Sequence, residues 1–257
     1  MVHHPSRNAT LPSATANVDA STTKALMKAK DSHFKFLYFN VWARSELPRM
    51  ILSYVDASWE EVEFVPVLWE ENVSLKTTAR FVETKAIERY LGEKYDLLGS
   101  KDNAADPLEH QRLDEIYNNT DGVSILFDLM VLAPGPGEAR LTGARGFYAG
   151  PLKNWAEYHE GLLNAAGNNG HYLQSGKTTI ADLKTALMVC RVRFLVPEGV
   201  DVDKEVPVSK EKTPALWKLK ETIDAHPSMA KWVASARFNE LDVGTKVFMG
   251  FEKAREE

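Results

Sequence analysis

The chain has little cysteine, no long apolar run and no apolar leader, and each shortage excludes a class of protein. Cys190 is the single cysteine among 257 residues. One cysteine excludes an intramolecular disulfide, a CxxC redox pair and a cysteine-based metal site. No apolar stretch approaches the ~20 residues that cross a bilayer, and the first residues lack the apolar core of a signal peptide. We therefore expect a cytoplasmic protein with no membrane partner.

The charge balance gives no basic excess, and this argues against nucleic acid as the main partner. The chain carries 31 Lys and Arg against 36 Asp and Glu, for a formal net charge of -5. Proteins that bind nucleic acid or anionic membranes present clustered basic charge. A hydrophobic content of 44% and a charged content of 26% are ordinary for a soluble globular protein. The length suits one large domain or two modest ones.

The first half of the chain predicts a strand, a turn and a helix over residues 34–54. Aromatic residues favour the strand, and apolar residues recur at helical spacing from Glu46 onward. A second strand is predicted around 62–68 and is ended by Pro66. The helix between the strands has the length of a crossover connection, which predicts a parallel pair. Residues 84–95 predict another helix.

Beyond a polar, turn-rich linker the pattern is helical throughout. Thr179 stands three residues before Asp182, the pattern of a reciprocal helix cap, and we expect both residues to be structural. The predicted helices cover 113–130, with a bend near Asp121-Gly122, and then 152–166, 179–194, 213–225 and 229–238. The predicted organisation is a disordered tail at 1–32, an α/β domain at 33–96, an all-α domain at 107–245 and a C-terminal tail at 246–257.

Four short motifs, in the same order, resemble segments of the cytosolic glutathione transferases, specifically the sigma-like group. The motifs are Tyr38 to Glu46, Trp69 followed by Lys76, Glu83 to Ile87, and Tyr172-Leu173 followed by Thr179 to Asp182. The resemblance covers about residues 34–240. It implies a thioredoxin-like α/β domain joined to an all-α domain, glutathione as co-substrate, and a homodimer. The implied activity is attack of the glutathione thiolate on a small hydrophobic electrophile, or a glutathione-dependent isomerisation.

The resemblance also implies roles for single residues. Tyr38 would donate its phenol hydrogen to the thiolate. Such a bond to a charged group contributes ~1.5–3 kcal/mol, against the ~2.7 kcal/mol needed to lower a thiol pKa by two units. Arg44 would reinforce the thiolate through its charge. Thr84 would bind the γ-glutamyl carboxylate at a helix start, and Glu83 the substrate ammonium. The remaining implied glutathione contacts are Trp69 and Lys76 at the glycyl carboxylate and Asp114 toward a partner subunit's ligand; no metal ligand is implied.

Several of these residues also have plain structural interpretations. Tyr38 is a strand aromatic, Thr84 suits a helix N-cap, and Asp114 suits a solvated helix face. Trp69 and Lys76 suit a packing indole and an exposed lysine.

The segment before Thr84 leaves two alternatives open. Two antiparallel strands and a hairpin need about twelve residues, and seven lie between Lys76 and Thr84. Either the sheet is truncated, which we expect, or Val65 to Leu68 forms the later strand and leaves Trp59 to Glu63 for the crossover. On the first alternative Pro66 is not the cis-proline of the family.

A truncated sheet keeps a second function open, that of a non-catalytic binding or scaffolding protein of the same fold. The anionic Glu83, beside the place where the family binds a carboxylate, supports this alternative. A thiol-disulfide enzyme is a third and weaker option, because residues 40–45 contain no cysteine. Generic apolar candidates for the electrophile site are Leu126, Met130, Leu132 and Phe147.

Overall fold

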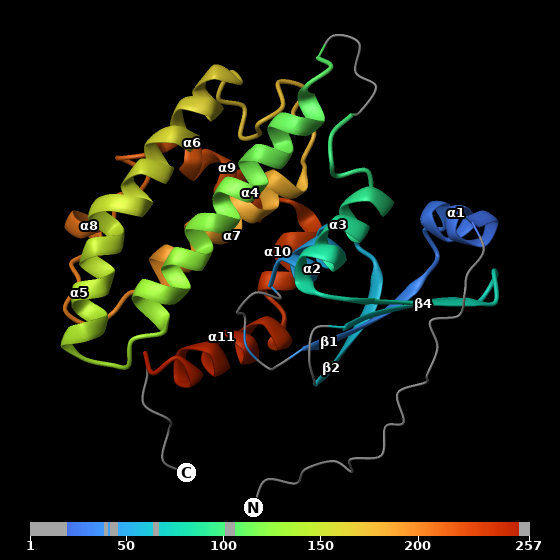
Figure 1. Ribbon diagram of the computed structural model, residues 1–257, viewed down its shortest axis with the longest axis horizontal. Coiled ribbons are helices and arrows are strands. Elements are labelled where there is room, and N and C mark those ends of the chain that lie inside the picture. The colour runs from blue at the N-terminus through green and yellow to red at the C-terminus, as the bar shows by residue number, and fades with distance from the viewer. Residues whose placement is uncertain (1–19, 39–40, 42–45, 64–66, 101–105, 252–257) are drawn as a thin grey trace, which may run out of the picture.

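A small sheet packs beside a larger bundle of helices, as Figure 1 shows for the computed structural model. The structure describes residues 20–38, 41, 46–63, 67–100 and 106–251. We refer to residues 20–100 as the sheet region and to residues 106–251 as the helical region. Within the described ranges, no helix is both long and apolar enough to cross a membrane.

The sheet region contains four strands in the order β2-β1-β3-β4. The strands are β1 (His33–Tyr38), β2 (Ser58–Glu63), β3 (Val67–Asn72) and β4 (Thr77–Val82). Strand β1 pairs with β2 in parallel, whereas β1 with β3 and β3 with β4 are antiparallel. Helix α2 (Glu46–Tyr54) connects β1 to β2. The predicted crossover and the predicted parallel pair are confirmed.

The sheet is not truncated, and that expectation is wrong. Residues 69–82 contain the end of β3, a turn and β4. Strand β2 ends at Glu63 and β3 begins at Val67, so the later strand lies near Val65 to Leu68 as in the second alternative, but Trp59 to Glu63 form part of β2 and not a crossover. The sequence pattern suggested one strand where there are two, because no polar turn separates β2 from β3. The number of residues left for the later strands was therefore underestimated. Pro66 lies outside the described residues.

Helix α2 and helix α3 (Thr84–Lys94) pack against one face of the sheet. Apolar side chains from both helices and from β1 and β3 form one buried cluster, which includes Phe34, Phe36, Leu47, Ile51, Leu68, Ile87 and Leu91. On β4, the Phe81 ring stacks on the Tyr90 ring of α3 with a centroid separation of 3.7 Å. This packing fixes the start of α3 against the end of β4.

A further helix, α1 (Ala20–Lys28), lies in the stretch expected to be a disordered tail. Leu26 is 3% exposed, and its carbonyl accepts a hydrogen bond from Lys94 Nζ at 2.5 Å. Asp31 accepts a hydrogen bond from Asn72 Nδ2 at 3.0 Å. The structure therefore differs from the expected tail at residues 20–32, and residues 1–19 lie outside the described ranges.

The helical region is centred on α7 (Ile180–Phe194), which packs against α4 and α9 and also against α2 of the sheet region. The other elements are α4 (Glu109–Phe127), η2 (Asp128–Leu132), α5 (Glu138–Phe147), η3 (Tyr148–Leu152), α6 (Lys153–Ala165), α8 (Val202–Glu205), α9 (Pro214–Asp224), α10 (Pro227–Val233) and α11 (Ala236–Phe248). Both η elements are π-helical. Because α7 contacts both regions, its side chains can help to build a site between them.

Of two local predictions about the helices, one is confirmed and the other is wrong. The reciprocal cap is confirmed, since Thr179 Oγ1 accepts from the Asp182 backbone and Asp182 Oδ2 accepts from the Thr179 backbone at 2.7 Å. The expected bend near Asp121-Gly122 is wrong, because α4 continues to Phe127 and changes to π-helix only after it. A single glycine costs a helix only ~1 kcal/mol, and the packing of α4 overrides that cost.

Candidate functional site

The strand register brings two of the predicted site residues to the same edge of the sheet. Leu37 pairs with Val67, and Val67 pairs with Val82. Tyr38 follows Leu37 and Glu83 follows Val82, so both residues leave the sheet at this edge. The chain enters α3 at the same place.

Glu83 holds a backbone conformation that side-chain-bearing residues rarely adopt, with φ of 71° and ψ of 120°. Such a conformation costs ~1–3 kcal/mol and persists mainly at functional sites. Glu83 is the N-cap residue of α3, so the prediction that Thr84 caps this helix is wrong. In the described part of the chain no side chain caps α3. The first N–H groups of α3 therefore remain available to an anionic ligand.

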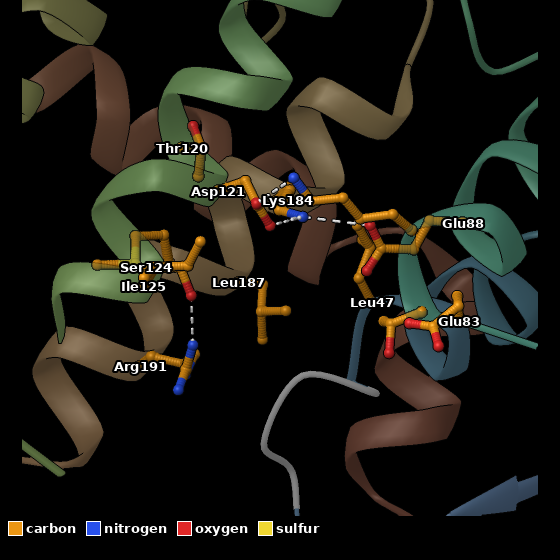
Figure 2. Close-up of a pocket in the computed structure, with 13 residues that line it drawn as sticks. Leu47, Glu83, Glu88, Thr120, Asp121, Ser124, Ile125, Lys184, Leu187 and Arg191 are labelled. Carbon is orange, nitrogen blue, oxygen red and sulfur yellow. Dashed lines mark hydrogen bonds and ion pairs between the residues drawn. The ribbon is translucent and has the colours of Figure 1, made fainter. Parts of the chain in front are cut away.

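The start of α3 opens into a cleft of about 230 Å³ between the sheet region and the helical region. Figure 2 shows side chains from α3, α4 and α7 converging on it. The lining is Leu47, Glu83, Thr84, Lys85, Glu88, Thr120, Asp121, Ser124, Ile125, Lys184, Leu187, Met188 and Arg191. The four α7 residues follow helical spacing and present one face of that helix to the cleft.

Four charged residues form a chain along the wall of the cleft, and we call Glu88, Lys184, Asp121 and Lys85 the cleft ion chain. Lys184 Nζ lies 3.2 Å from Glu88 Oε2 and 2.8 Å from Asp121 Oδ1. Lys85 Nζ lies 2.6 Å from Asp121 Oδ2. Tyr117 donates its hydroxyl hydrogen to Glu88. The chain joins α3 to α4 and α7, and its two acids balance its two bases.

Burial differs along this chain. The desolvated carboxyl of Glu88 has a raised pKa, although Lys184 and Tyr117 counteract part of that effect. Asp121 is partly buried, which opposes ionisation, but hydrogen bonds from Lys184 and Lys85 lower its pKa overall. The Lys85 side chain is 59% exposed. The inner end of the chain is therefore closed and the outer end is open to a ligand.

The opposite wall of the cleft is largely apolar. It consists of Ile125 on α4 and of Leu187 and Met188 on α7, with the Ser124 hydroxyl among them, whereas Leu47 lies beside Glu83 and Glu88 (Figure 2). Arg191 borders this wall but is already engaged: it donates to Ser124 Oγ at 2.6 Å and to Asp128 Oδ1 at 2.7 Å. The cleft thus has a polar end at α3 and an apolar end between α4 and α7.

The predicted apolar candidates do not form this wall, because the cleft lining contains none of Leu126, Met130, Leu132 and Phe147. Leu126 is 39% exposed, and Phe147 is fully buried in the helical core. Ile125 faces the cleft, and a step of one residue on a helix turns the next side chain by about 100°. The sequence predicted this helix, but it did not predict which face of the helix is turned toward the sheet region.

Tyr38 lies beside a second buried group of charges, which we call the α2 ion cluster: Glu46, Arg49, Glu61 and Arg237. The Arg49 guanidinium is 5.6 Å from the Tyr38 ring centroid. Arg49 donates to Glu61 Oε1 at 2.9 Å and to Glu46 Oε2 at 3.2 Å. Arg237 Nε donates to Glu61 Oε2 at 2.8 Å. The cluster therefore ties α2 and β2 to α11.

Three of the four side chains in this cluster are withdrawn from solvent, whereas the Arg237 side chain is 31% exposed. The Arg49 side chain is 0% exposed and that of Glu46 is 2% exposed. Burial raises the pKa of Glu46 to about 7, although the Arg49 charge acts in the opposite direction. The sequence analysis missed Arg49; the one available signal was an arginine inside the apolar run of a helix.

Tyr38 itself does not line the cleft, and the remaining predicted site residues lie elsewhere. Trp69 is buried in the middle of β3, where it pairs with Lys35 and Arg80. Lys76 belongs to the turn between β3 and β4, at the end of the sheet opposite Tyr38. Neither residue lines the cleft.

Asp114 also lies outside the cleft, on α4, where it forms an ion pair with Arg89 of α3. Arg44 is outside the described residues. Among the described residues, no group of three or more His, Cys, Asp or Glu side chains is placed to hold a metal ion.

Comparison with known proteins bears on this arrangement. Residues 131–236 match the family model described as the glutathione S-transferase C-terminal domain. The solved structure of a sigma class glutathione transferase from Fasciola hepatica is similar, with a TM-score of 0.65 and 18% sequence identity. The family-model match concerns residues 131–236, and the structural similarity shows that the chain has the glutathione transferase fold. The structural match covers 81% of this chain and 100% of that chain. No curated protein sequence matches this chain.

The glutathione transferase fold accounts for both regions. The four-stranded mixed sheet with α2 and α3 forms the thioredoxin-like part, and the segment that matches the family model lies within the helical part. The predicted fold class is confirmed, except that the sheet is complete.

Proposed function

We propose that this protein is a glutathione transferase that joins the glutathione thiolate to a small hydrophobic electrophile. One observation carries the proposal: the strained Glu83 and the uncapped start of α3 face the cleft, at the sheet edge from which Tyr38 also leaves. Backbone strain at an open helix start is retained where a ligand uses it. A glutathione-dependent isomerisation would use the same groups.

Glutathione binding is assigned to the polar end of the cleft. The γ-glutamyl carboxylate accepts hydrogen bonds from the first N–H groups of α3 and from the Thr84 hydroxyl, and Glu83 pairs with the ammonium group. Lys85 adds positive charge beside the carboxylate. Trp69 and Lys76 are not assigned to this site. Trp69 lies in the middle of β3, and Lys76 lies in the turn between β3 and β4, at the opposite end of the sheet.

In the proposed reaction Tyr38 donates its hydroxyl hydrogen to the glutathione sulfur and so stabilises the thiolate. The thiolate attacks the electrophilic carbon, a carbon–sulfur bond forms, and the leaving group departs with its bonding electron pair. The thiol proton passes to solvent. Stacking on Phe36, with ring centroids 6.3 Å apart, orients the Tyr38 ring, and Arg44 is proposed to reinforce the thiolate by charge.

Other parts of the proposal rest on family resemblance. They are a cytoplasmic homodimer, a boundary between two domains within residues 96–107, and a role for Asp114 toward the partner's glutathione. In one protomer Asp114 already pairs with Arg89, so such a role requires competition with that ion pair.

The proposal is tested with immobilised glutathione and with a chloronitrobenzene as a generic acceptor. We expect the protein to be retained by glutathione and to form the thioether. Tyr38→Phe should lower kcat/KM by about 10–100-fold, the worth of one hydrogen bond to a charged atom, and leave glutathione binding nearly unchanged. Tyr158→Phe is the matched control, because Tyr158 lies on α6 of the helical region and donates its hydroxyl hydrogen to Glu115. Failure of the wild-type protein both to bind and to conjugate would overturn the proposal.

The second candidate is a non-catalytic binding protein of the same fold. Its remaining support is Glu83, whose negative charge lies beside the proposed carboxylate site. On this alternative, glutathione is retained but Tyr38→Phe changes no reaction rate.

A further inference from the structure

Leu187 on α7 stands in the middle of the cleft, between the α4 wall and the α3 end, as Figure 2 shows. The same residue also lines a smaller pocket of about 40 Å³, which faces α2 and α10 and is partly open to solvent at Val233. We call this space the inner pocket; its walls include Met50, Cys190, Met229 and Trp232. Leu187 is the residue shared by both linings, so its side chain separates the two spaces.

The cleft by itself is small. An apolar cavity of about 150 Å³ holds one benzene molecule, and this cleft of about 230 Å³ must also admit the sulfur end of glutathione. A single ring therefore fills its apolar end. The inner pocket could extend that end with mostly apolar side chains, although Glu46 and Asp224 also line it, and Leu187 lies between the two spaces.

We propose that Leu187 is the specificity-determining residue that limits the acceptor to a single-ring apolar electrophile, by closing the inner pocket to the cleft. The inference rests on the proposed function, since it assumes that an acceptor occupies the apolar end of the cleft. It adds the size class of the acceptor and the residue that sets it. Truncation of Leu187 joins the two spaces and gives a second ring a place between Met50 and Met229.

The first experiment compares two aryl halides with the same leaving group, one built on benzene and one on naphthalene. Both react by the same carbon–sulfur bond formation and halide departure, so ring size is the only variable. Leu187→Ala should raise the ratio of kcat/KM for the naphthalene over the benzene acceptor by about tenfold or more. Leu187→Met conserves volume and should leave the ratio within about twofold.

Leu129→Ala is the matched leucine control, because Leu129 is 61% exposed on η2 and lies outside both linings. Its acceptor ratio should equal that of the wild type. Melting temperatures of all variants show whether each is folded. A wild-type ratio in a folded Leu187→Ala protein overturns the proposal.

A second readout needs no glutathione activity. Cys190, the single cysteine of the chain, lines the inner pocket, so its reaction rate with an aryl maleimide reports entry of a ring. The rate should rise several-fold in Leu187→Ala and remain unchanged in Leu129→Ala. An unchanged rate in Leu187→Ala overturns the separation of the two spaces.

The two readouts also distinguish this inference from the proposed function. Absence of conjugation by every variant, together with faster labelling of Leu187→Ala, overturns the proposed function and the acceptor role but supports the separation. Conjugation with an unchanged acceptor ratio supports the proposed function and overturns the role of Leu187.

Discussion

The α2 ion cluster and the cleft ion chain both join the sheet region to the helical region, and they differ in access to solvent. In the α2 ion cluster the Arg49 side chain is 0% exposed, and its partner Glu61 is 6% exposed. In the cleft ion chain exposure rises outward from Glu88, at 2%, to Lys85, at 59%. The α2 ion cluster is closed around Arg49 and is partly exposed only at Arg237, at 31%, whereas the cleft ion chain ends in a lysine that is 59% exposed.

This difference separates a structural role from a binding role. A closed cluster has no room for a ligand, and loss of one member leaves a charge without a partner in a desolvated place. A chain with an exposed end loses little when that end is removed, but the end remains available to an incoming anion. Four substitutions test this comparison, and they are ordered by the expected change in stability.

Arg49→Met should have the largest effect. The substitution leaves Glu46 without its buried partner and Glu61 with Arg237 alone, and it should lower the free energy of unfolding by about 3–5 kcal/mol. Chemical denaturation measures the loss. Arg145→Met is the control, because Arg145 pairs with Glu205 at 2.8 Å but its side chain is 50% exposed, and it should cost under about 1 kcal/mol. Equal losses in both variants would contradict the closed character of the cluster.

Lys184→Met should come next, with a loss of about 2–3 kcal/mol. The loss is smaller because this ion chain is less deeply buried: the Lys184 and Asp121 side chains are 9% and 16% exposed, whereas Arg49 is 0% exposed. The added substitution Glu88→Leu should restore part of the stability, since no buried charge then lacks a partner. Lys153→Met, at a side chain that is 57% exposed, serves as the control. A loss in Lys184→Met no larger than in this control would show that the cleft ion chain is open along its whole length.

Glu46 gives the α2 ion cluster a pH dependence. Its pKa in the folded state is raised from 4.5 to about 7, so between these values the folded protein holds a proton that the unfolded chain has released. Its contribution to stability is complete below pH 4.5 and is lost as the pH rises through 7.

Wild-type protein should therefore lose about 2 kcal/mol more stability between pH 5 and pH 8 than Glu46→Gln does. Denaturant titrations across this range measure the difference. Glu240→Gln, at an exposed partner of Arg237, should keep the wild-type slope. Parallel slopes for wild type and Glu46→Gln would mean that Arg49 keeps Glu46 ionised throughout.

Lys85→Met should have the smallest effect on stability, under about 1 kcal/mol, because the side chain is largely exposed. Glutathione affinity should nevertheless fall about fivefold, through loss of ~1 kcal/mol of attraction for the carboxylate. Calorimetric titration with glutathione measures this, with Lys177→Met as the control at an exposed pair remote from the cleft. Unchanged affinity would remove Lys85 from the proposed site.

The sequence predicted those parts of the fold that depend on neighbouring residues. The parallel pair of β1 and β2 followed from the length of the crossover, and the cap of α7 followed from Thr179 and Asp182 three residues apart. The boundary between β2 and β3 did not follow, because both strands contribute to one apolar run. Of the candidate site residues, Glu83 and Thr84 line the cleft, whereas Trp69 and Lys76 do not. Their motif matched in residue type but not in position along the sheet.

The sequence by itself determined the order of elements, the family resemblance and the absence of cysteine chemistry, because these depend on composition and on spacing along the chain. Only the tertiary structure decided which charges are buried and which face a ligand. Lys184 and Lys85 both lie in the first turns of helices, and their neighbours in the sequence do not distinguish them. Lys184 lies between acids from α3 and α4, whereas Lys85 has water on one side. That distinction arises only when helices distant in sequence pack together, since burial and electrostatic partnership are properties of the assembled fold.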